Sequence, residues 1–446
     1  MIRDTAQDPA SLGWTGILRL GLVQAALGAV VVLVTSTLNR VMVVEYALPA
    51  LLPGMLVALH YAVQIVRPRF GHGSDRGGRR TPWIIGGMAA LALGGVLCAL
   101  AAVSLRRFPT AALLLAIGAY SLVGLGVGAA GTSLLALMAR RVDDRRRAPA
   151  ATIMWVLMIA GFAVTSITAG HFLDPYSPQR LVLVTAVVGL IALSVAAAAV
   201  FGLDRGGVVG AGTAGGGARA GVDFATALRS VWSEPEARNF TMFVFVSMLA
   251  YSAQELLLEP FCGVVFGYTV GESARLSGLW HAAVLIGMVC VGVACGGARR
   301  FGSLRAWTIG GCCASAAAIS SLACAGIVGP AWPLRASAVL LGLSNGVFAV
   351  AAIGSMMELA HRGEANGAGV RMGLWGASQA VAFACGGVLG TGIVDLVGHV
   401  VQAPVVAYVT VFGVEAALFL VAARFAFRVS AQARRDSNSE LTAVAA

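Results

Sequence analysis

Long apolar segments separated by short polar ones recur along the whole chain of 446 residues. A helix needs about 20 apolar residues to cross about 30 Å of hydrocarbon. Twelve segments meet this requirement: 17–38, 49–66, 82–105, 111–138, 149–173, 181–203, 240–258, 276–297, 306–328, 335–359, 372–395 and 404–427. The pattern therefore predicts an all-α membrane protein with twelve transmembrane helices.

The composition supports this prediction and excludes other classes. Hydrophobic residues make up 58% of the chain and charged residues only 11%, whereas soluble domains carry about 25% charged residues. The apolar runs are too long for the alternating strands of a membrane barrel. The first run is also too long for a cleaved signal peptide, and no small-residue cleavage site follows it.

The basic residues predict how the helices are oriented. All 31 are arginines. If the N-terminus is cytoplasmic, 25 of them fall on cytoplasmic segments and 6 on the opposite side. Cytoplasmic loops are enriched in Lys and Arg. We therefore expect both termini to be cytoplasmic.

One long polar connection, 204–239, divides the chain. Its Gly/Ala-rich first part predicts a flexible linker. Its second part could form a short interfacial helix with Phe224, Leu228, Val231 and Trp232 on the apolar face. The predicted organisation is an N-terminal six-helix bundle (1–203), this cytoplasmic linker, a C-terminal six-helix bundle (240–428) and a cytoplasmic tail (429–446).

The two halves repeat at a nearly constant offset. A shift of 221 residues places His60 on His281, Arg79 on Arg300 and Asp174 on Asp395, and a shift of 220 places Trp155 on Trp375. A shared offset indicates a duplicated unit. Two pseudo-symmetric six-helix bundles are the architecture of the major facilitator fold.

The loop after the second span carries a motif of that fold. It fits the pattern G-x-x-x-D-R-x-G-R-R at Gly71, Asp75, Arg76, Gly78, Arg79 and Arg80. Glycines permit a tight turn, and the basic cluster favours the cytoplasmic face. The motif predicts a conformational or structural role, and the alternative is a simple positively charged loop.

Four stretches resemble the PucC/LhaA family, the bacteriochlorophyll-delivery branch of the major facilitator superfamily. They are LNRVMVVEYALPALLPG (38–54), RPRFGHGSDRGGRRTPWI (67–84), QELLLEPFCGVVFGYTVGESARLSGLW (254–280) and GLWGASQAVAFACGG (373–387). The resemblance implies a factor in the inner or intracytoplasmic membrane of phototrophic bacteria. Such a factor would assist assembly of light-harvesting complexes, handling bacteriochlorophyll as cargo or protecting antenna polypeptides.

Glu255 and Glu259 are candidates for binding a pigment or a partner helix. They are four residues apart and therefore share one helix face, and Pro260 is expected to end the helix. The alternative is a helix end whose carboxylates face water or pair with Arg275.

His60 and His281 lie inside predicted spans at equivalent points of the two halves. A neutral imidazole can ligate the magnesium of a chlorin, so the pair could hold a pigment. The alternative is that each histidine forms hydrogen bonds between helices.

Charged side chains are rare in the predicted first-half spans, whose main polar residues are Gln24, His60 and Gln64. This favours an apolar partner over ion-coupled transport. We find no catalytic triad, nucleotide-binding loop, Cys/His metal spacing or nucleic-acid surface, so we expect neither an enzyme, a protein metal site nor a nucleic-acid partner. Two hypotheses remain: an antenna assembly factor in the lipid bilayer, or a secondary transporter of a small apolar molecule.

Overall fold

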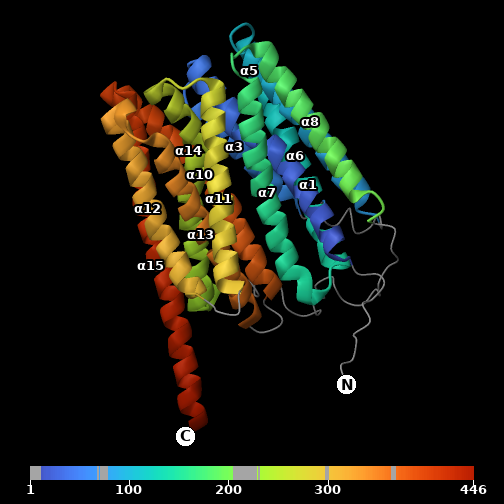
Figure 1. The fold of residues 1–446 in the computed structure, drawn as a ribbon, viewed down its shortest axis with the longest axis vertical. Helices are drawn as coiled ribbons and strands as arrows, with labels where there is room; N and C mark the ends of the chain where they lie inside the picture. Colours follow the sequence, from blue (N-terminus) through green and yellow to red (C-terminus); the bar gives the residue numbers. More distant parts are fainter. Residues whose placement is uncertain are drawn as a thin grey trace. The chain divides into compact units, whose positions relative to one another are not determined.

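A computed structural model describes residues 12–67, 70, 79–203, 229, 232–296, 301–362 and 368–445, and every regular element within these ranges is a helix. The described residues fall into two compact units. Unit 1 comprises those within Met1–Val34, Val63–Ser166 and Tyr176–Gly217. Unit 2 comprises those within Thr35–Ala62, Ile167–Pro175 and Ala218–Ala446. Figure 1 shows the helices of both units.

Unit 1 contains most of the helices of the first half, and these meet through small residues. They are α1 (Trp14–Val32), α5 (Thr81–Ser104), α6 (Pro109–Arg141), most of α7 (Asp144–Phe172) and α8 (Pro178–Val200). Helix α5 packs against both α6 and α8 (Figure 1). A Cβ added at Gly126 of α6 would lie 2.6 Å from the Leu91 nitrogen of α5. The two backbones therefore approach each other directly, as small residues allow in membranes.

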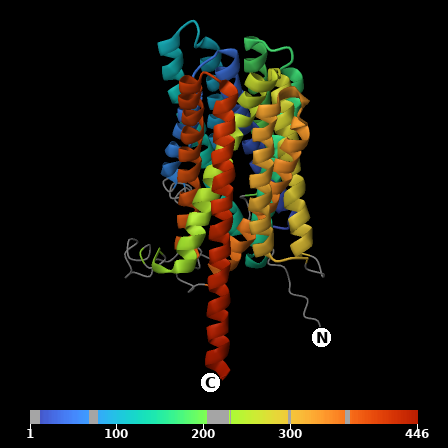
Figure 2. The ribbon, with the colours of Figure 1, turned by 90° about the vertical axis from the view of Figure 1, so that its left-hand side faces the viewer.

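Unit 2 contains the second-half helices together with the segment that follows α1. Its helices are α2 (Leu38–Arg40), α3 (Leu51–Val63), α10 (Pro235–Phe266), α11 (Val270–Gly296), α12 (Leu304–Val328), α13 (Leu334–Arg362), α14 (Ala368–Val401) and α15 (Pro404–Ala445). Helix α10 packs against α11, α14 and α15. Figure 2 shows the C-terminal part of α15 extending past the other helices of this unit.

The helices confirm the predicted all-α membrane fold. Among the described residues, eleven helices are long and apolar enough to cross a membrane, and the shorter apolar helix Leu51–Val66 corresponds to the remaining predicted span. In lipid each helix satisfies its own backbone hydrogen bonds, so apolar length alone locates most spans. The cytoplasmic location of the termini and the division at 204–239 remain predictions.

Several helices run beyond the predicted span ends, and two of these extensions carry polar groups. The first helix does not stop at residue 38; it continues through two π-helical segments, Leu33–Thr37 and Val41–Glu45, so Arg40 lies within it. Helix α10 does not stop at residue 258 but runs past Pro260 to Phe266. Both continuations place polar groups in the interior of unit 2, where these groups form hydrogen bonds with one another and with neighbouring residues.

Candidate functional site

Polar side chains from two segments of unit 2 meet in its interior, and we call this group the polar ladder. It consists of Thr35, Ser36, Asn39, Arg40, Glu255 and Glu259, all of which are buried. The Thr35 hydroxyl donates a hydrogen bond to Glu255 Oε1 at 3.2 Å, and the Ser36 hydroxyl donates to Glu259 Oε1 at 2.7 Å. The ladder thus joins the helix that precedes α3 to α10.

Arg40 is the most heavily bonded member of the polar ladder. Its side chain is only 1% exposed. It forms an ion pair with Glu45 at 2.7 Å, donates to the Tyr268 carbonyl at 2.6 Å and donates to the Ser273 hydroxyl at 3.1 Å. A buried charge is tolerated only with such a set of partners. Arg40 therefore fastens the turn before α11 to the first helix.

Asn39 explains why α10 continues through Pro260. Proline has no N–H, so the carbonyl of Leu256, four residues earlier, receives no helical hydrogen bond. The Asn39 side-chain amide donates to that carbonyl. Since an unsatisfied carbonyl is costly in an apolar interior, this contact removes the reason for the helix to end.

The structure settles how Glu255 and Glu259 are placed. They share one face of α10, as their spacing predicts, and are bonded to the adjacent residues Thr35 and Ser36. The alternative of a helix end with carboxylates in water or paired with Arg275 is wrong. Both carboxylates are buried, and Arg275 pairs with Asp174 at 3.2 Å.

His60 of α3 and His281 of α11 are both buried in unit 2. They are linked by a chain of aromatic rings that we call the aromatic chain: Tyr61, Phe383, Tyr251 and Trp280. Successive ring centroids from His60 to His281 are 4.9, 5.2, 6.1, 6.0 and 4.5 Å apart. These separations are those of interacting aromatic pairs.

The hydrogen bond of His281 determines which ring nitrogen could act as a ligand. Its Nδ1 lies 2.8 Å from the carbonyl of Ser277. A carbonyl only accepts, so Nδ1 carries the hydrogen and Nε2 of the neutral ring carries the lone pair. This tautomer is the one that metal-ligating histidines adopt when Nδ1 is held by a carbonyl.

The loop motif is described only at its end. Gly71, Asp75, Arg76 and Gly78 lie outside the described residues, so their predicted role remains a prediction. Arg79 is exposed, and Arg80 is buried at the start of α5. Of the predicted interfacial helix, Phe224, Leu228 and Val231 also lie outside the described residues.

Sequence reasoning missed Arg40, the hydroxyl partners of the two glutamates and the aromatic chain. The sequence does contain a signal for Arg40 and for the hydroxyl partners. Thr35 and Asn39 are four residues apart, as are Ser36 and Arg40, which matches the spacing of Glu255 and Glu259. The aromatic chain has no such signal, because its members come from α3, α10, α11 and α14.

Solved transporters share this helix arrangement. A bacterial homologue of the human lysosomal transporter Spinster matches 93% of this chain and 96% of its own, with a TM-score of 0.70 and 16% identity. The nucleoside transporter NupG matches 93% of this chain and 99% of its own, with a TM-score of 0.68 and 11% identity. The protein thus has the major facilitator fold, and it is a multi-pass bacterial membrane protein.

Sequence comparison then identifies the family within that class. The sequence model of the family described as "PUCC protein" matches residues 37–434, so the chain belongs to this family. A Rhodobacter capsulatus protein named "Bacteriochlorophyll synthase 44.5 kDa chain" is 51% identical over 94% of this chain and 96% of its own. "Protein PucC" of the same species is 28% identical over 95% of this chain and 93% of its own.

Proposed function

We propose that this protein is a membrane assembly factor for photosynthetic light-harvesting antenna complexes, which handles or delivers bacteriochlorophyll, chaperones antenna polypeptides, or does both. The observation that carries the proposal is the 51% identity, along nearly the whole chain, to a relative named for bacteriochlorophyll. Membership of the PUCC protein family over residues 37–434 supports the same assignment.

The chemistry of unit 2 supports a pigment as cargo. Neutral imidazole is a suitable ligand for chlorin magnesium, and aromatic rings offer faces against which a macrocycle can stack. His60, His281 and the aromatic chain supply both kinds of group in one unit. The hydrogen bond at Nδ1 leaves Nε2 of the neutral His281 ring with the lone pair that ligation requires.

A secondary transporter of a small apolar molecule is the second candidate, because solved transporters share the fold. The membrane spans of unit 1 weigh against an ion-coupled version. The described spans within 14–34, 81–104, 109–141, 149–166 and 178–200 contain no Asp, Glu or His. Carriers that couple to protons use titratable groups inside the membrane, and in the described spans the buried carboxylates Glu255, Glu259 and Glu415 all belong to unit 2.

We also propose a carrier or chaperone role over a catalytic one, despite the word "synthase" in the name of the relative. The buried polar groups of the ladder are bonded to one another across helices, which suits a structural support. A purified chain that formed bacteriochlorophyll from a precursor would contradict this part of the proposal.

A histidine exchange tests pigment binding. The protein is purified from native membranes in mild detergent, and pigment absorbance per mole of protein is measured. We expect the double variant His60→Leu, His281→Leu to lose most of its pigment. The matched control is His171→Leu, His399→Leu, which replaces two exposed histidines. Undiminished pigment in the His60, His281 variant would contradict ligation by these residues.

Co-purifying polypeptides separate the two candidate functions. An assembly factor should retain antenna polypeptides on the affinity-purified chain, and its deletion should lower the antenna level in cells that still make pigment. A transporter should retain no antenna polypeptide and should move a labelled apolar substrate into proteoliposomes.

The proposed orientation has a separate test. Reporter fusions at 142–146 and 214–220 should report the cytoplasm, and fusions at 176–178 the opposite side, as the arginine distribution predicts. An external signal from the 204–239 linker would contradict the division into two six-helix halves.

A further inference from the structure

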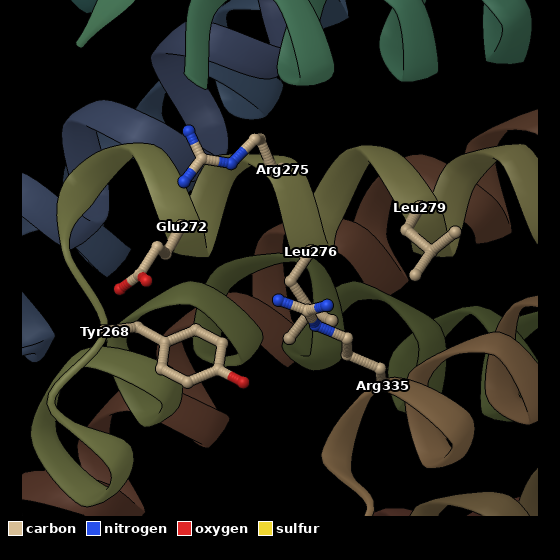
Figure 3. A pocket seen from close by; sticks show the side chains of 6 residues that line it. All are labelled: Tyr268, Glu272, Arg275, Leu276, Leu279 and Arg335. Carbon is tan, nitrogen blue, oxygen red and sulfur yellow. The ribbon is translucent and has the colours of Figure 1, made fainter. Parts of the chain in front are cut away.

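A pocket with a volume of about 270 Å³ lies at one end of unit 2, where α11 and α13 begin (Figure 3). Its lining includes no histidine and no member of the polar ladder. Polar and apolar side chains line it together: Tyr268, Glu272, Arg275, Leu276, Leu279 and Arg335. Such a mixed lining suits a ligand with one charged and one apolar part.

The acidic groups at this pocket are already engaged. Glu272 accepts a hydrogen bond from the Thr269 N–H at 2.9 Å, and its own N–H donates to the Thr269 hydroxyl at 3.1 Å. This reciprocal pair is a capping box that begins α11. Asp174 accepts from the Gly271 N–H at 3.1 Å and pairs with Arg275. Both carboxylates therefore already have partners, and neither requires an additional cation to balance its charge.

Arg335 differs from these carboxylates, because no hydrogen bond or ion pair joins it to another of the described residues. It is exposed at the second residue of α13. A cation at a helix N-terminus is disfavoured by the helix dipole, which instead attracts an anion. Figure 3 shows the guanidinium and the Tyr268 hydroxyl pointing into the same space. The pocket thus presents two donors for which the described residues supply no acceptor.

The pocket opens onto an apolar strip along α11. Leu279, Ile286 and Val293 are 37%, 55% and 70% exposed. They are seven residues apart, which is close to two helical turns, so they line one side of the helix. An acyl chain could lie on this strip while its headgroup stays in the pocket.

Contacts with other residues hold two of the lining residues, Tyr268 and Arg275, in place. The Tyr268 carbonyl accepts the hydrogen bond from Arg40, and Arg275 donates to the Gly170 carbonyl at 3.2 Å in addition to its pair with Asp174. A preformed site loses less conformational entropy when a ligand binds.

We propose that this pocket binds the phosphate of an anionic phospholipid through Arg335 and Tyr268, with one acyl chain along Leu279, Ile286 and Val293. The proposal does not depend on the function proposed above, because none of its contacts involves His60, His281 or the aromatic chain.

The test is a titration of the purified full chain in detergent with dioleoylphosphatidylglycerol, followed by native mass spectrometry. Arg335→Gln should weaken binding roughly tenfold, the size of one charge-assisted hydrogen bond. Tyr268→Phe, which keeps the ring and the carbonyl, should weaken it by about threefold. The matched control, Arg107→Gln, replaces an exposed arginine of unit 1 and should bind like the wild type.

Two further ligands identify the source of the phosphate. Dioleoylphosphatidylcholine should bind more weakly than phosphatidylglycerol, and inorganic phosphate at equal concentration should not displace the lipid. Equal affinity for both lipids, displacement by inorganic phosphate, or unchanged binding to Arg335→Gln would each overturn the proposal. Circular dichroism and the elution profile of each variant show that the fold is retained.

Discussion

Helices meet through small residues in both units, but in unit 2 buried carboxylates, an arginine and aromatic rings also reach from helix to helix. The described spans of unit 1 contain no Asp, Glu or His, while unit 2 buries Glu255, Glu259 and Glu415 together with His60 and His281. Close contact between backbones leaves no room for a ligand but holds helices firmly. Buried polar groups cost stability unless they are paired, and they are retained mainly where they serve a function.

From this difference we infer that unit 1 acts mainly as a scaffold and that the candidate chemistry lies in unit 2. Both units should be sensitive to added volume, and unit 2 should in addition be sensitive to the loss of a hydrogen-bonding partner. Four substitution experiments test this comparison, and each can be measured as the free energy of unfolding in mixed detergent micelles.

The largest effect is expected at Arg40 of unit 2. Arg40→Met should lower the free energy of unfolding by about 3–5 kcal/mol, because it removes the ion pair with partly exposed Glu45 together with the buried donors to Tyr268 and Ser273. Arg107→Met, at an exposed position of unit 1, should change it little. A stable Arg40→Met variant would show that unit 2 does not depend on its polar ladder.

Added volume should be costly at Gly126 of unit 1. Gly126→Leu places a Cβ 2.6 Å from the Leu91 nitrogen, a backbone atom that cannot move aside easily. We expect a loss of about 3 kcal/mol from overpacking. Gly118→Leu in the same helix is the control, because nothing lies within 4 Å of a Cβ there. If both variants were equally stable, close packing would not be what holds unit 1 together.

Asn39 and Pro260 should show coupled effects in unit 2. Asn39→Leu leaves the Leu256 carbonyl without a donor, which should cost about 2 kcal/mol. In the background of Pro260→Ala the residue at 260 supplies its own N–H, so the same change at Asn39 should cost clearly less. A double-mutant cycle measures this coupling, and strictly additive effects would contradict the explanation given for α10.

The smallest effect is expected at Asn345, which connects three helices of unit 2. Its amide donates to Gln254 Oε1 at 2.8 Å, and its Oδ1 accepts from the Ser315 hydroxyl at 2.9 Å. Interhelical hydrogen bonds in membranes contribute about 1 kcal/mol each, so Asn345→Ala should cost about 1–2 kcal/mol. Among the described residues, the adjacent Ser344 bonds to the Leu340 carbonyl of its own helix, and Ser344→Ala should be nearly neutral.

Most of the fold could be predicted from the sequence. The spans follow from apolar length, because a helix in lipid must satisfy its backbone within itself. The two extensions that carry polar groups, beyond residue 38 and residue 258, share a cause. Considered alone, the segment with Asn39 and Arg40 looks like the end of a helix. The segment with Pro260 does so as well. The partners that allow each helix to continue lie more than 200 residues away in the chain.

The candidate site was predictable only in part. The spacing of Glu255 and Glu259 placed them on one helix face, but their pairing with Thr35 and Ser36 depends on two helices meeting at one register. The offset between His60 and His281 drew attention to both residues. It could not show that Tyr61, Phe383, Tyr251 and Trp280 lie between them.

The sequence by itself determined that this is a twelve-helix membrane protein of the major facilitator fold, and its quoted stretches indicated the family. Those properties depend on hydropathy and local motifs, which act along the chain. Only the tertiary structure decided that Arg40 is buried and that α10 continues through Pro260. In an interior without water, a polar group is stable only where another segment supplies its partner, and such partners are set by the packing of distant helices.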